Sequence, residues 1–206
     1  SKYEFRYGDM SNPELVQRAL VDITDVVILA GLVGDPICNR YPSEAERVNK
    51  SALGAALNVI SSTTLESAVF ISTCSNYGLI PDSDLASETY QLAPLSSYAS
   101  AKVESERLFL DLMQKGAVLK PVVLRFATAF GLSPRMRFDL TVNEFTRELY
   151  LGKNLEVFDP DTWRPYCHVS DFARLVETVF EAAPELVAFE IFNAGGNSNN
   201  HTKRDI

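Results

Sequence analysis

The stretch "DVVILAG", residues 25–31, is apolar on both faces of any strand that it forms. Such a strand belongs in the middle of a parallel sheet, where helices cover both faces. Two more segments share this character, "AVFIST" (68–73) and "PVVLRFAT" (121–128). Amphipathic stretches separate the three, and this alternation is typical of βαβ units. The sequence therefore predicts an α/β fold with a doubly wound parallel sheet.

Local signals predict the remaining elements. Asn12 and Pro13 have the positions of an N-cap and a first helical residue, so a helix follows them. Ser43 and Glu46 have capping-box spacing before a helix that reaches about Ile60. We further predict strands over 3–9, 155–158 and 189–196, an extended segment over 164–169, a helix from "YASAK" (98–102) to about Lys115, and helices near 139–150 and from Ser170.

Composition excludes several classes of protein. The chain has 206 residues, of which 46% are hydrophobic and 22% charged, which suits one well-buried domain. Its formal net charge of −8 argues against a nucleic-acid partner, since such binding needs clustered Lys and Arg. The apolar runs are shorter than the roughly 20 residues that span a bilayer. Three widely spaced cysteines suggest reduced thiols and hence a cytoplasmic protein without a metal site.

One motif of nucleotide-binding sheets is missing. The 206 residues contain no G-x-G-x-x-G spacing, although a dinucleotide-binding sheet normally opens with such a turn. The chain begins within a predicted strand, and "NHTKRDI" (200–206) looks like the beginning of a helix. We therefore expect an N-terminal glycine-rich segment and a C-terminal part to belong to a longer parent.

Tyr98 and Lys102 form the most informative constellation in the sequence. Residues four apart on a helix share one face, so the ammonium can lie beside the phenol. A neighbouring cation lowers the pKa of a tyrosine from about 10 toward the range of a general base. Thr73 follows a predicted parallel strand, at the edge where such sheets bind ligands, and its hydroxyl can orient a substrate oxygen.

At these residues the chain resembles the extended short-chain dehydrogenase/reductases, and among them the NAD-dependent nucleotide-sugar epimerases and dehydratases. The resemblance covers almost the whole chain and rests on eight motifs in the family's order. These are "YGDM", "VVILAG", "ERVN", "FISTCSNYG", "PLSSYASAK", "VVLRFATAFG", "WRPYCHVSD" and "FNAGG". The resemblance implies a Rossmann-like sheet, N-terminally incomplete, with part of a small substrate-binding region.

The resemblance also implies site residues. The catalytic trio is Thr73, Tyr98 and Lys102. The cofactor, NAD with NADP left open, is implied to lie against Asp9, Met10, Leu29, Ala30, Gly31, Asn49, Ser72, Tyr98, Lys102 and Phe126. The substrate, a nucleotide-diphosphate sugar, is implied to contact Thr73, Thr128 and Arg164, and Arg137 is a further candidate contact. For Arg137 and its neighbour Arg135, a phosphate or sugar contact and a solvated loop position both stay open.

Three readings of function follow. The first is an NAD-dependent nucleotide-sugar epimerase-like oxidoreductase in which Tyr98 moves the hydroxyl proton. The others are an NAD(P)H-dependent keto-sugar reductase and a non-catalytic nucleotide-sugar-binding remnant. Dehydration is disfavoured, because Cys74 and Ser75 stand where dehydratases carry an acidic pair.

Two expectations concern organisation. We assign residues 1–131 to the dinucleotide-binding part and 132–206 to a substrate-binding part interleaved with the last Rossmann elements. The resemblance also suggests a homodimer through the tyrosine-bearing helix, and the apolar stripe from Leu108 to Met113 suits that interface and ordinary core packing equally.

Overall fold

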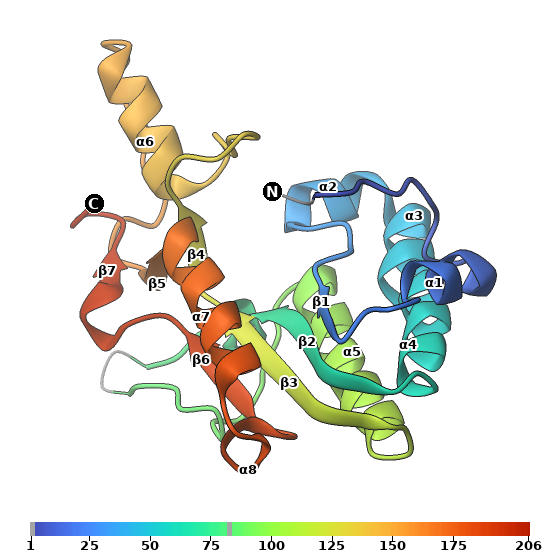
Figure 1. Ribbon diagram of the computed structural model, residues 1–206. Helices are drawn as coiled ribbons and strands as arrows, with labels where there is room; N and C mark the ends of the chain where they lie inside the picture. Colours follow the sequence, from blue (N-terminus) through green and yellow to red (C-terminus); the bar gives the residue numbers. More distant parts are fainter. Residues whose placement is uncertain (1–2, 82–83) are drawn as a thin grey trace.

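A four-stranded parallel sheet lies at the centre of the computed structural model, which describes residues 3–81 and 84–206 (Figure 1). Its order is β1-β2-β3-β6, with bounds Asp25–Ile28, Leu65–Thr73, Val118–Phe126 and Ile191–Ala194. The register places Val27 beside Val69, and Thr73 beside Phe126. The three apolar stretches of the sequence are therefore three adjacent parallel strands, as predicted.

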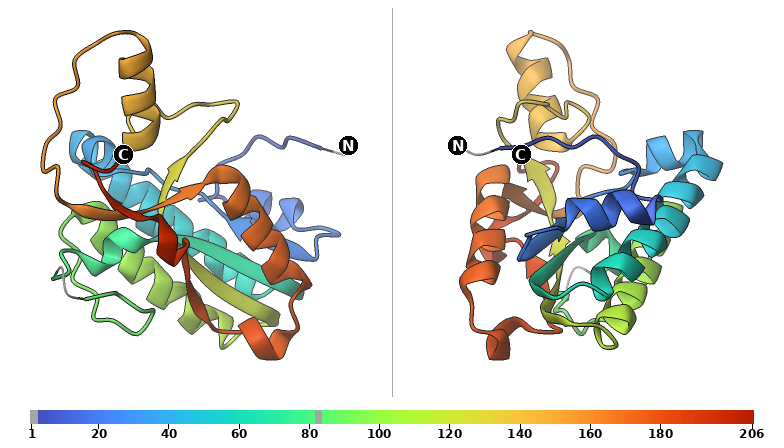
Figure 2. Two further views of the ribbon diagram at one scale, coloured as in Figure 1. Left: turned by 90° about the vertical axis from the view of Figure 1, so that its left-hand side faces the viewer. Right: turned by 45° about the vertical axis from the view of Figure 1, so that its right-hand side comes forward.

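Helices cover both faces of this sheet, which confirms the doubly wound architecture. Along β2, Phe70 packs into a core with α4 (Leu53–Ser61) and α5 (Ser97–Met113), whereas Val69 and Ile71 pack into a second core with α7 (Val169–Glu181). Figure 2 shows α7 on the opposite side of the sheet from α4 and α5. Alternate residues of one strand thus enter two cores, which is why the strand is apolar throughout.

A second, three-stranded sheet follows the end of β3. Its order is β4-β5-β7, with bounds Thr128–Phe130, Trp163–His168 and Asn200–Thr202. Strand β5 runs parallel to β4 and antiparallel to β7. Helix α6 (Thr141–Tyr150) projects beyond this sheet (Figure 1). The first sheet is completed after β5, when β6 pairs with β3, and β7 then completes the second sheet.

The shorter elements complete the chain. They are the α-helices α1 (Pro13–Ala19), α2 (Asp35–Arg40), α3 (Pro42–Glu46) and α8 (Pro184–Val187), a π-helix η1 (Arg47–Ala52), and the 3-10 helices η2 (Cys74–Tyr77) and η3 (Asn197–Asn199). The predicted N-cap of α1 is confirmed, since Asn12 Oδ1 accepts hydrogen bonds from the amides of Glu14 and Leu15. Over residues 3–81 and 84–206, no helix has the length and apolar content needed to cross a membrane.

Two predicted strands are wrong. Residues 3–9 form no strand, and the side chains of Tyr3, Phe5 and Tyr7 are 82%, 72% and 94% exposed. Residues 155–158 are likewise irregular despite their alternating burial. Alternation suits a strand only when a neighbouring backbone accepts its hydrogen bonds, and within the described chain neither segment has one.

Two predicted helix features are also wrong. Ser43 does not cap a helix, because Pro42 takes the first helical position of α3 and Tyr41 is the N-cap. The segment after Asn199, which we predicted to begin a helix, forms strand β7. His201 of β7 lies opposite Arg164 of β5. A three-residue strand with polar side chains carries no local signal of its own, so only its pairing with β5 makes it a strand.

Candidate active site

The start of α5 presents the predicted tyrosine and lysine at the carboxyl edge of the parallel sheet. Ser96 is the N-cap, and its Oγ accepts a hydrogen bond from the Ala99 amide at 3.2 Å. Tyr98 lies in the first turn and is partly buried, and Lys102 lies one turn later with 7% of its surface exposed. The cap thus fixes where the helix begins, and with it the positions of both side chains.

Lys102 is directed toward strand β2. Its ammonium donates a hydrogen bond to the Ile71 carbonyl at 2.8 Å and lies 4.7 Å from the centroid of the Phe70 ring. Burial lowers the pKa of Lys102 to about 8, while the neighbouring Glu106 carboxylate opposes this shift. A hydrogen bond and a cation–π contact therefore hold a buried ammonium whose charge is weakly stabilised.

Tyr98 does not have the lowered pKa that its spacing from Lys102 predicts. Burial raises the pKa of Tyr98 to about 12, and negative charge at Cys38 and Asp35 adds to the rise. Arg137 is the cation that opposes it. The sequence-based expectation fails here because the ammonium of Lys102 bonds a backbone carbonyl and the phenol is removed from water. In this structure Tyr98 is a neutral phenol near pH 7.

Thr73 ends β2, as predicted, and caps the short helix η2. Its Oγ1 accepts a hydrogen bond from the Ser75 amide at 3.1 Å. Since a hydroxyl both donates and accepts, the O–H of Thr73 still has its proton to donate. Ser72 is buried, and its Oγ accepts a hydrogen bond from Asn76 at 3.1 Å, while its cofactor contact stays a prediction. Its hydroxyl supports the loop after β2.

A groove of about 360 Å³ lies beside the end of β1. Its lining residues are Tyr7, Gly8, Asp9, Met10, Ala30, Gly31 and Val48. Four residues that were predicted to bind the cofactor come together in it, from segments 20 residues apart in the chain: Asp9, Met10, Ala30 and Gly31. Leu29, another predicted contact, is 64% exposed next to them. The groove combines apolar walls with one carboxylate.

Asp9 is held in place at the groove. Its carboxylate accepts a hydrogen bond from the Ser11 amide at 2.9 Å, and Arg47 lies 3.4 Å from its other oxygen. The Ser11 hydrogen bonds, and to a lesser degree Arg47, lower the pKa of Asp9. The carboxylate is therefore ionised at neutral pH and able to accept a hydrogen bond from a ligand.

Asn49 shapes the floor of the site. Its side-chain amide bonds the Leu32 backbone twice, accepting from the amide at 2.8 Å and donating to the carbonyl at 3.0 Å. Both functional ends of the side chain are used, so Asn49 orders the loop after β1, and its cofactor contact stays a prediction. It also lines a narrow crevice with Ala30 and Lys102. Ala30 borders both hollows, although the crevice beside Lys102 is too narrow to hold a water molecule.

The predicted substrate side is more dispersed. Phe126 stacks on Phe172 with ring centroids 3.8 Å apart, and Thr128 begins β4 opposite Tyr166. Arg164 is exposed on β5, and its guanidinium bonds the adjacent carbonyl of Trp163. The described contacts therefore do not join Arg164 to Tyr98 or Thr73. Within residues 3–81 and 84–206, no cluster of His, Cys, Asp and Glu could hold a metal ion.

Sequence reasoning missed a buried ion pair next to the site. Arg125 of β3 and Glu106 of α5 pair at 2.8 Å, with side chains 3% and 4% exposed. Arg125 also donates to the hydroxyl of Tyr77 at 2.8 Å, and Asn76 donates to Glu106 at 2.8 Å. The sequence did contain a signal for this pair, because Arg125 lies within the apolar run "PVVLRFAT" and a buried guanidinium needs a carboxylate partner.

Comparison with known proteins identifies the family. The model of the NAD dependent epimerase/dehydratase family matches residues 1–195. The chain belongs to the NAD-dependent epimerase/dehydratase family. A Bacillus subtilis member described as the uncharacterized UDP-glucose epimerase YtcB is 30% identical over 149 residues, which cover 72% of this chain and 45% of the relative. A UDP-glucose 4-epimerase of Rhizobium leguminosarum bv. trifolii is 32% identical over an alignment of 140 residues, and the match covers 56% of this chain and 42% of the relative.

Solved members of the family have the same fold. The UDP-glucuronic acid 4-epimerase from Bacillus cereus, in complex with UDP-glucuronic acid and NAD, superposes with a TM-score of 0.86 at 25% identity. The match covers 100% of this chain and 63% of that enzyme. MoeE5, in complex with UDP-glucose and NAD, has a TM-score of 0.84 at 25% identity, over 97% of this chain and 65% of MoeE5. The chain thus spans less than half of these curated relatives and under two thirds of these solved structures.

Proposed function

We propose that this protein is a nucleotide-sugar epimerase-like oxidoreductase that uses NAD. The groove carries the proposal, because Asp9, Met10 and Ala30 meet in it beside the carboxyl end of the parallel strand β1. That edge is where doubly wound sheets bind nucleotides. NAD and UDP-sugars in the related structures support the same ligands here.

The residues of the groove fit parts of NAD. Met10 and Val48 offer an apolar surface to a flat base, and the Asp9 carboxylate can accept a hydrogen bond from an amino group. Lys102, on α5, has three ammonium protons, one of which bonds Ile71, so it can also donate to a ribose hydroxyl. When bound, NAD would supply reversible hydride transfer at a sugar carbon.

Proton transfer is assigned to Tyr98 and Thr73. The phenol oxygen of Tyr98 would take the proton of a sugar hydroxyl and later return it, while the free O–H of Thr73 holds the same sugar oxygen. A phenol with a pKa of about 12 stays protonated near neutral pH, so it cannot accept a proton until it ionises. The abstraction step therefore needs positive charge close to Tyr98, which favours the phenolate.

Tyr98→Phe tests the proposal. We expect kcat for UDP-glucose or UDP-glucuronic acid to fall by about 100-fold or more, because the proton has no acceptor, while NAD binding stays close to wild type. Turnover is followed by separating the sugar nucleotides, and retained NAD by mass spectrometry of denatured protein. Tyr150→Phe, at a side chain 89% exposed on α6, is the matched control. Full turnover in Tyr98→Phe would reject the assignment.

A further inference from the structure

The side chain of Asn76 joins the end of strand β2 to helix α5. Its Nδ2 donates hydrogen bonds to Ser72 Oγ at 3.1 Å and to Glu106 Oε1 at 2.8 Å, and the residue is completely buried. Since a carboxylate only accepts, the end of the side chain that faces Glu106 is the NH2 group. Both amide protons are therefore used, one toward the strand and one toward the helix.

On the strand side, this link encloses Thr73. Ser72 directly precedes Thr73, and Asn76 lies three residues after it, in the short helix η2. The Thr73 hydroxyl accepts a hydrogen bond from the Ser75 amide of the same short helix at 3.1 Å. The bond from Asn76 to Ser72 thus fixes the backbone on both sides of the hydroxyl that the proposed reaction uses.

On the helix side, the link ends on a firmly held carboxylate. Glu106 lies one turn beyond Lys102 and about two turns beyond Tyr98 on α5. Arg125 of β3 donates to the two oxygens of Glu106 at 3.1 and 2.8 Å. The helix that carries the tyrosine is therefore joined to the loop after Thr73 through an anchor that the sheet itself holds.

The backbone of Asn76 makes a further connection, to the segment that leads into α5. Its carbonyl accepts a hydrogen bond from the Ala93 amide at 3.1 Å, three residues before the N-cap Ser96. Close by, a β-carbon added at Gly78 would lie 2.1 Å from the Ala93 carbonyl oxygen, so the two segments are in tight contact. Asn76 is thus bonded to the chain both before and within the tyrosine-bearing helix.

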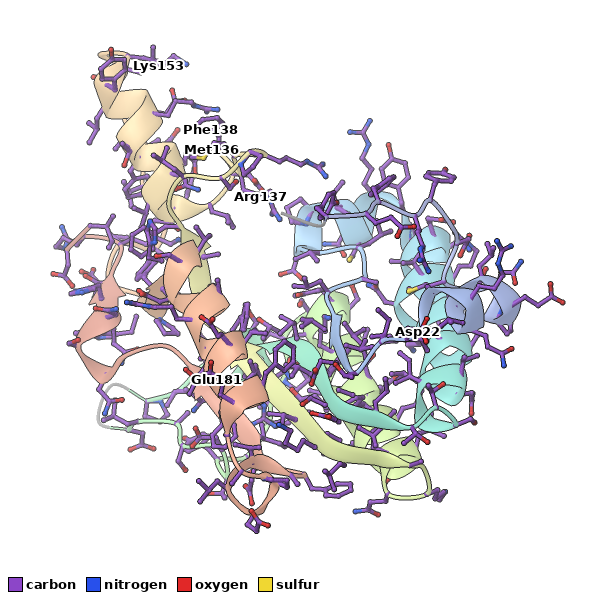
Figure 3. The ribbon with its side chains drawn as sticks, in the orientation of Figure 1. Asp22, Met136, Arg137, Phe138, Lys153 and Glu181 are labelled. Carbon is purple, nitrogen blue, oxygen red and sulfur yellow. The ribbon has the colours of Figure 1, made fainter. Side chains whose placement is uncertain are left out.

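Two other cations of the predicted site act elsewhere. Arg137 lies on the segment between β4 and α6, where its guanidinium bonds Asp139 at 2.7 Å (Figure 3). Lys102 does reach β2, at the Ile71 carbonyl. Asn76 adds a second tie between α5 and this strand end, next to Thr73.

The side chain of Asn76 is not the best choice for stability alone. Among the residues that the structure describes, none donates a hydrogen bond to its buried Oδ1. A buried carbonyl without a partner costs free energy, which an apolar side chain of similar size avoids. The geometry therefore favours a role in placing neighbouring groups.

We propose that Asn76 is a positioning residue that holds the hydroxyl of Thr73 in place relative to Tyr98. It acts through its hydrogen bonds to Ser72 and Glu106, since a completely buried side chain offers no surface to a ligand. The proposal deepens the function proposed above and rests on it.

Asn76→Leu tests the proposal, because it removes both hydrogen bonds while Glu106 keeps its bonds to Arg125. We expect kcat for UDP-glucose to fall by about 10-fold with little change in KM, since the Thr73 hydroxyl is no longer held in place. In a Thr73→Val background the same change should lower kcat by less than about twofold, because the hydroxyl that Asn76 positions is already gone. Val187→Ala, at a buried side chain of α8, is the control, which should lose stability and keep its kcat.

A second readout needs neither cofactor nor substrate. The Ser75 amide donates to Thr73 Oγ1, so its hydrogen exchange, followed by NMR, reports how firmly this hydroxyl is held. We expect this exchange to be about 10-fold faster in Asn76→Leu and close to the wild-type rate in Val187→Ala.

Wild-type kcat in Asn76→Leu overturns the proposal, and so does an equal loss of kcat with and without the Thr73 hydroxyl. If the wild-type protein turns over no sugar nucleotide, the proposed function fails, and the exchange of the Ser75 amide alone decides the role of Asn76. Unchanged exchange in Asn76→Leu then overturns that role. Full turnover in Tyr98→Phe instead rejects the proposed function, so the two failures are distinguishable.

Discussion

Lys102 shows how burial changes the chemistry of one side chain. Its ammonium is 7% exposed and is stabilised by one carbonyl and one aromatic ring. The pKa in the folded protein is about 8, below the 10.5 of an unburied lysine. The folded chain therefore releases this proton at a lower pH than the unfolded chain does. Below pH 8 the buried charge costs stability, and this cost disappears as the pH rises toward 10.5.

Lys102→Met removes this dependence. Relative to the variant, the wild-type protein should gain up to about 3 kcal/mol of unfolding free energy between pH 8 and 10.5, because its ammonium becomes neutral in that range. Urea denaturation of both proteins at several pH values measures the difference. Lys115→Met, at an exposed position after α5, is the control and should show a constant difference. If the difference in unfolding free energy between wild type and Lys102→Met did not change with pH, the lowered pKa of the buried Lys102 would be contradicted.

Strand β3 and helix α5 are joined by the pair of Arg125 and Glu106. The guanidinium bonds Glu106 through two nitrogens, at 3.1 and 2.8 Å, and donates to the Glu88 carbonyl at 3.0 Å. Neither charge is accessible to water, so each depends on the other for solvation. The pair thus fixes how the tyrosine-bearing helix sits on the sheet.

Glu106→Gln should destabilise the fold by about 3–5 kcal/mol, since it leaves a buried guanidinium without its counter-charge. Glu104→Gln is the matched control on the same helix. It breaks the exposed pair with Lys50, 3.0 Å apart, and should cost less than about 1 kcal/mol. Thermal and urea unfolding of the two variants give the comparison. Equal losses would show that the buried pair contributes no more than a surface pair.

The π-helix η1 is an element that sequence periodicity did not predict. It lies between α3 and α4 and contains Asn49, which is 6% exposed and bonded to Leu32. Wider helical turns of this kind occur often near functional sites. Asn49, on this helix, reaches the backbone of Leu32 and so orders the loop after β1.

Asn193 of β6 ties distant parts of the chain together. Its side chain accepts from the Tyr77 hydroxyl at 2.7 Å and donates to the Ala86 carbonyl at 3.1 Å. Its backbone amide donates to Glu88 at 2.8 Å. The segment after η2 is therefore fastened to a strand more than 100 residues away. The predicted division at residue 131 stays a prediction, although β6 does return to the first sheet.

Asn193→Ala should lower the unfolding free energy by about 1–3 kcal/mol, because partly buried polar groups lose their partners. Hydrogen exchange should also quicken in the segment around Ala86. Asn58→Ala, which removes an exposed side-chain bond within α4, should stay within about 0.5 kcal/mol of wild type. Equal stability of Asn193→Ala and Asn58→Ala would contradict the role of Asn193 in fastening the segment after η2.

The sequence pattern does not decide whether the apolar stripe from Leu108 to Met113 packs in the core or forms a dimer interface. Phe109 and Met113 are buried in the core against β2 and β3, while Leu108 is 38% exposed. The buried side chains fit core packing, and the partly exposed Leu108 fits a dimer interface. The homodimer therefore stays a prediction. Sedimentation analysis of the protein at increasing concentration addresses it.

Local pattern was sufficient for the layered α/β fold, the three central strands, the N-cap at Asn12 and the position of Thr73 at the end of its strand. These features depend on hydrophobic period and capping, which neighbouring residues specify. Burial and long-range contacts determined the rest: the pKa of Tyr98, the bond of Lys102 to Ile71, the Arg125–Glu106 pair and the bond of Asn76 to Glu106. Desolvation and charge pairing depend on which segments meet in space, and spacing along the chain does not encode that.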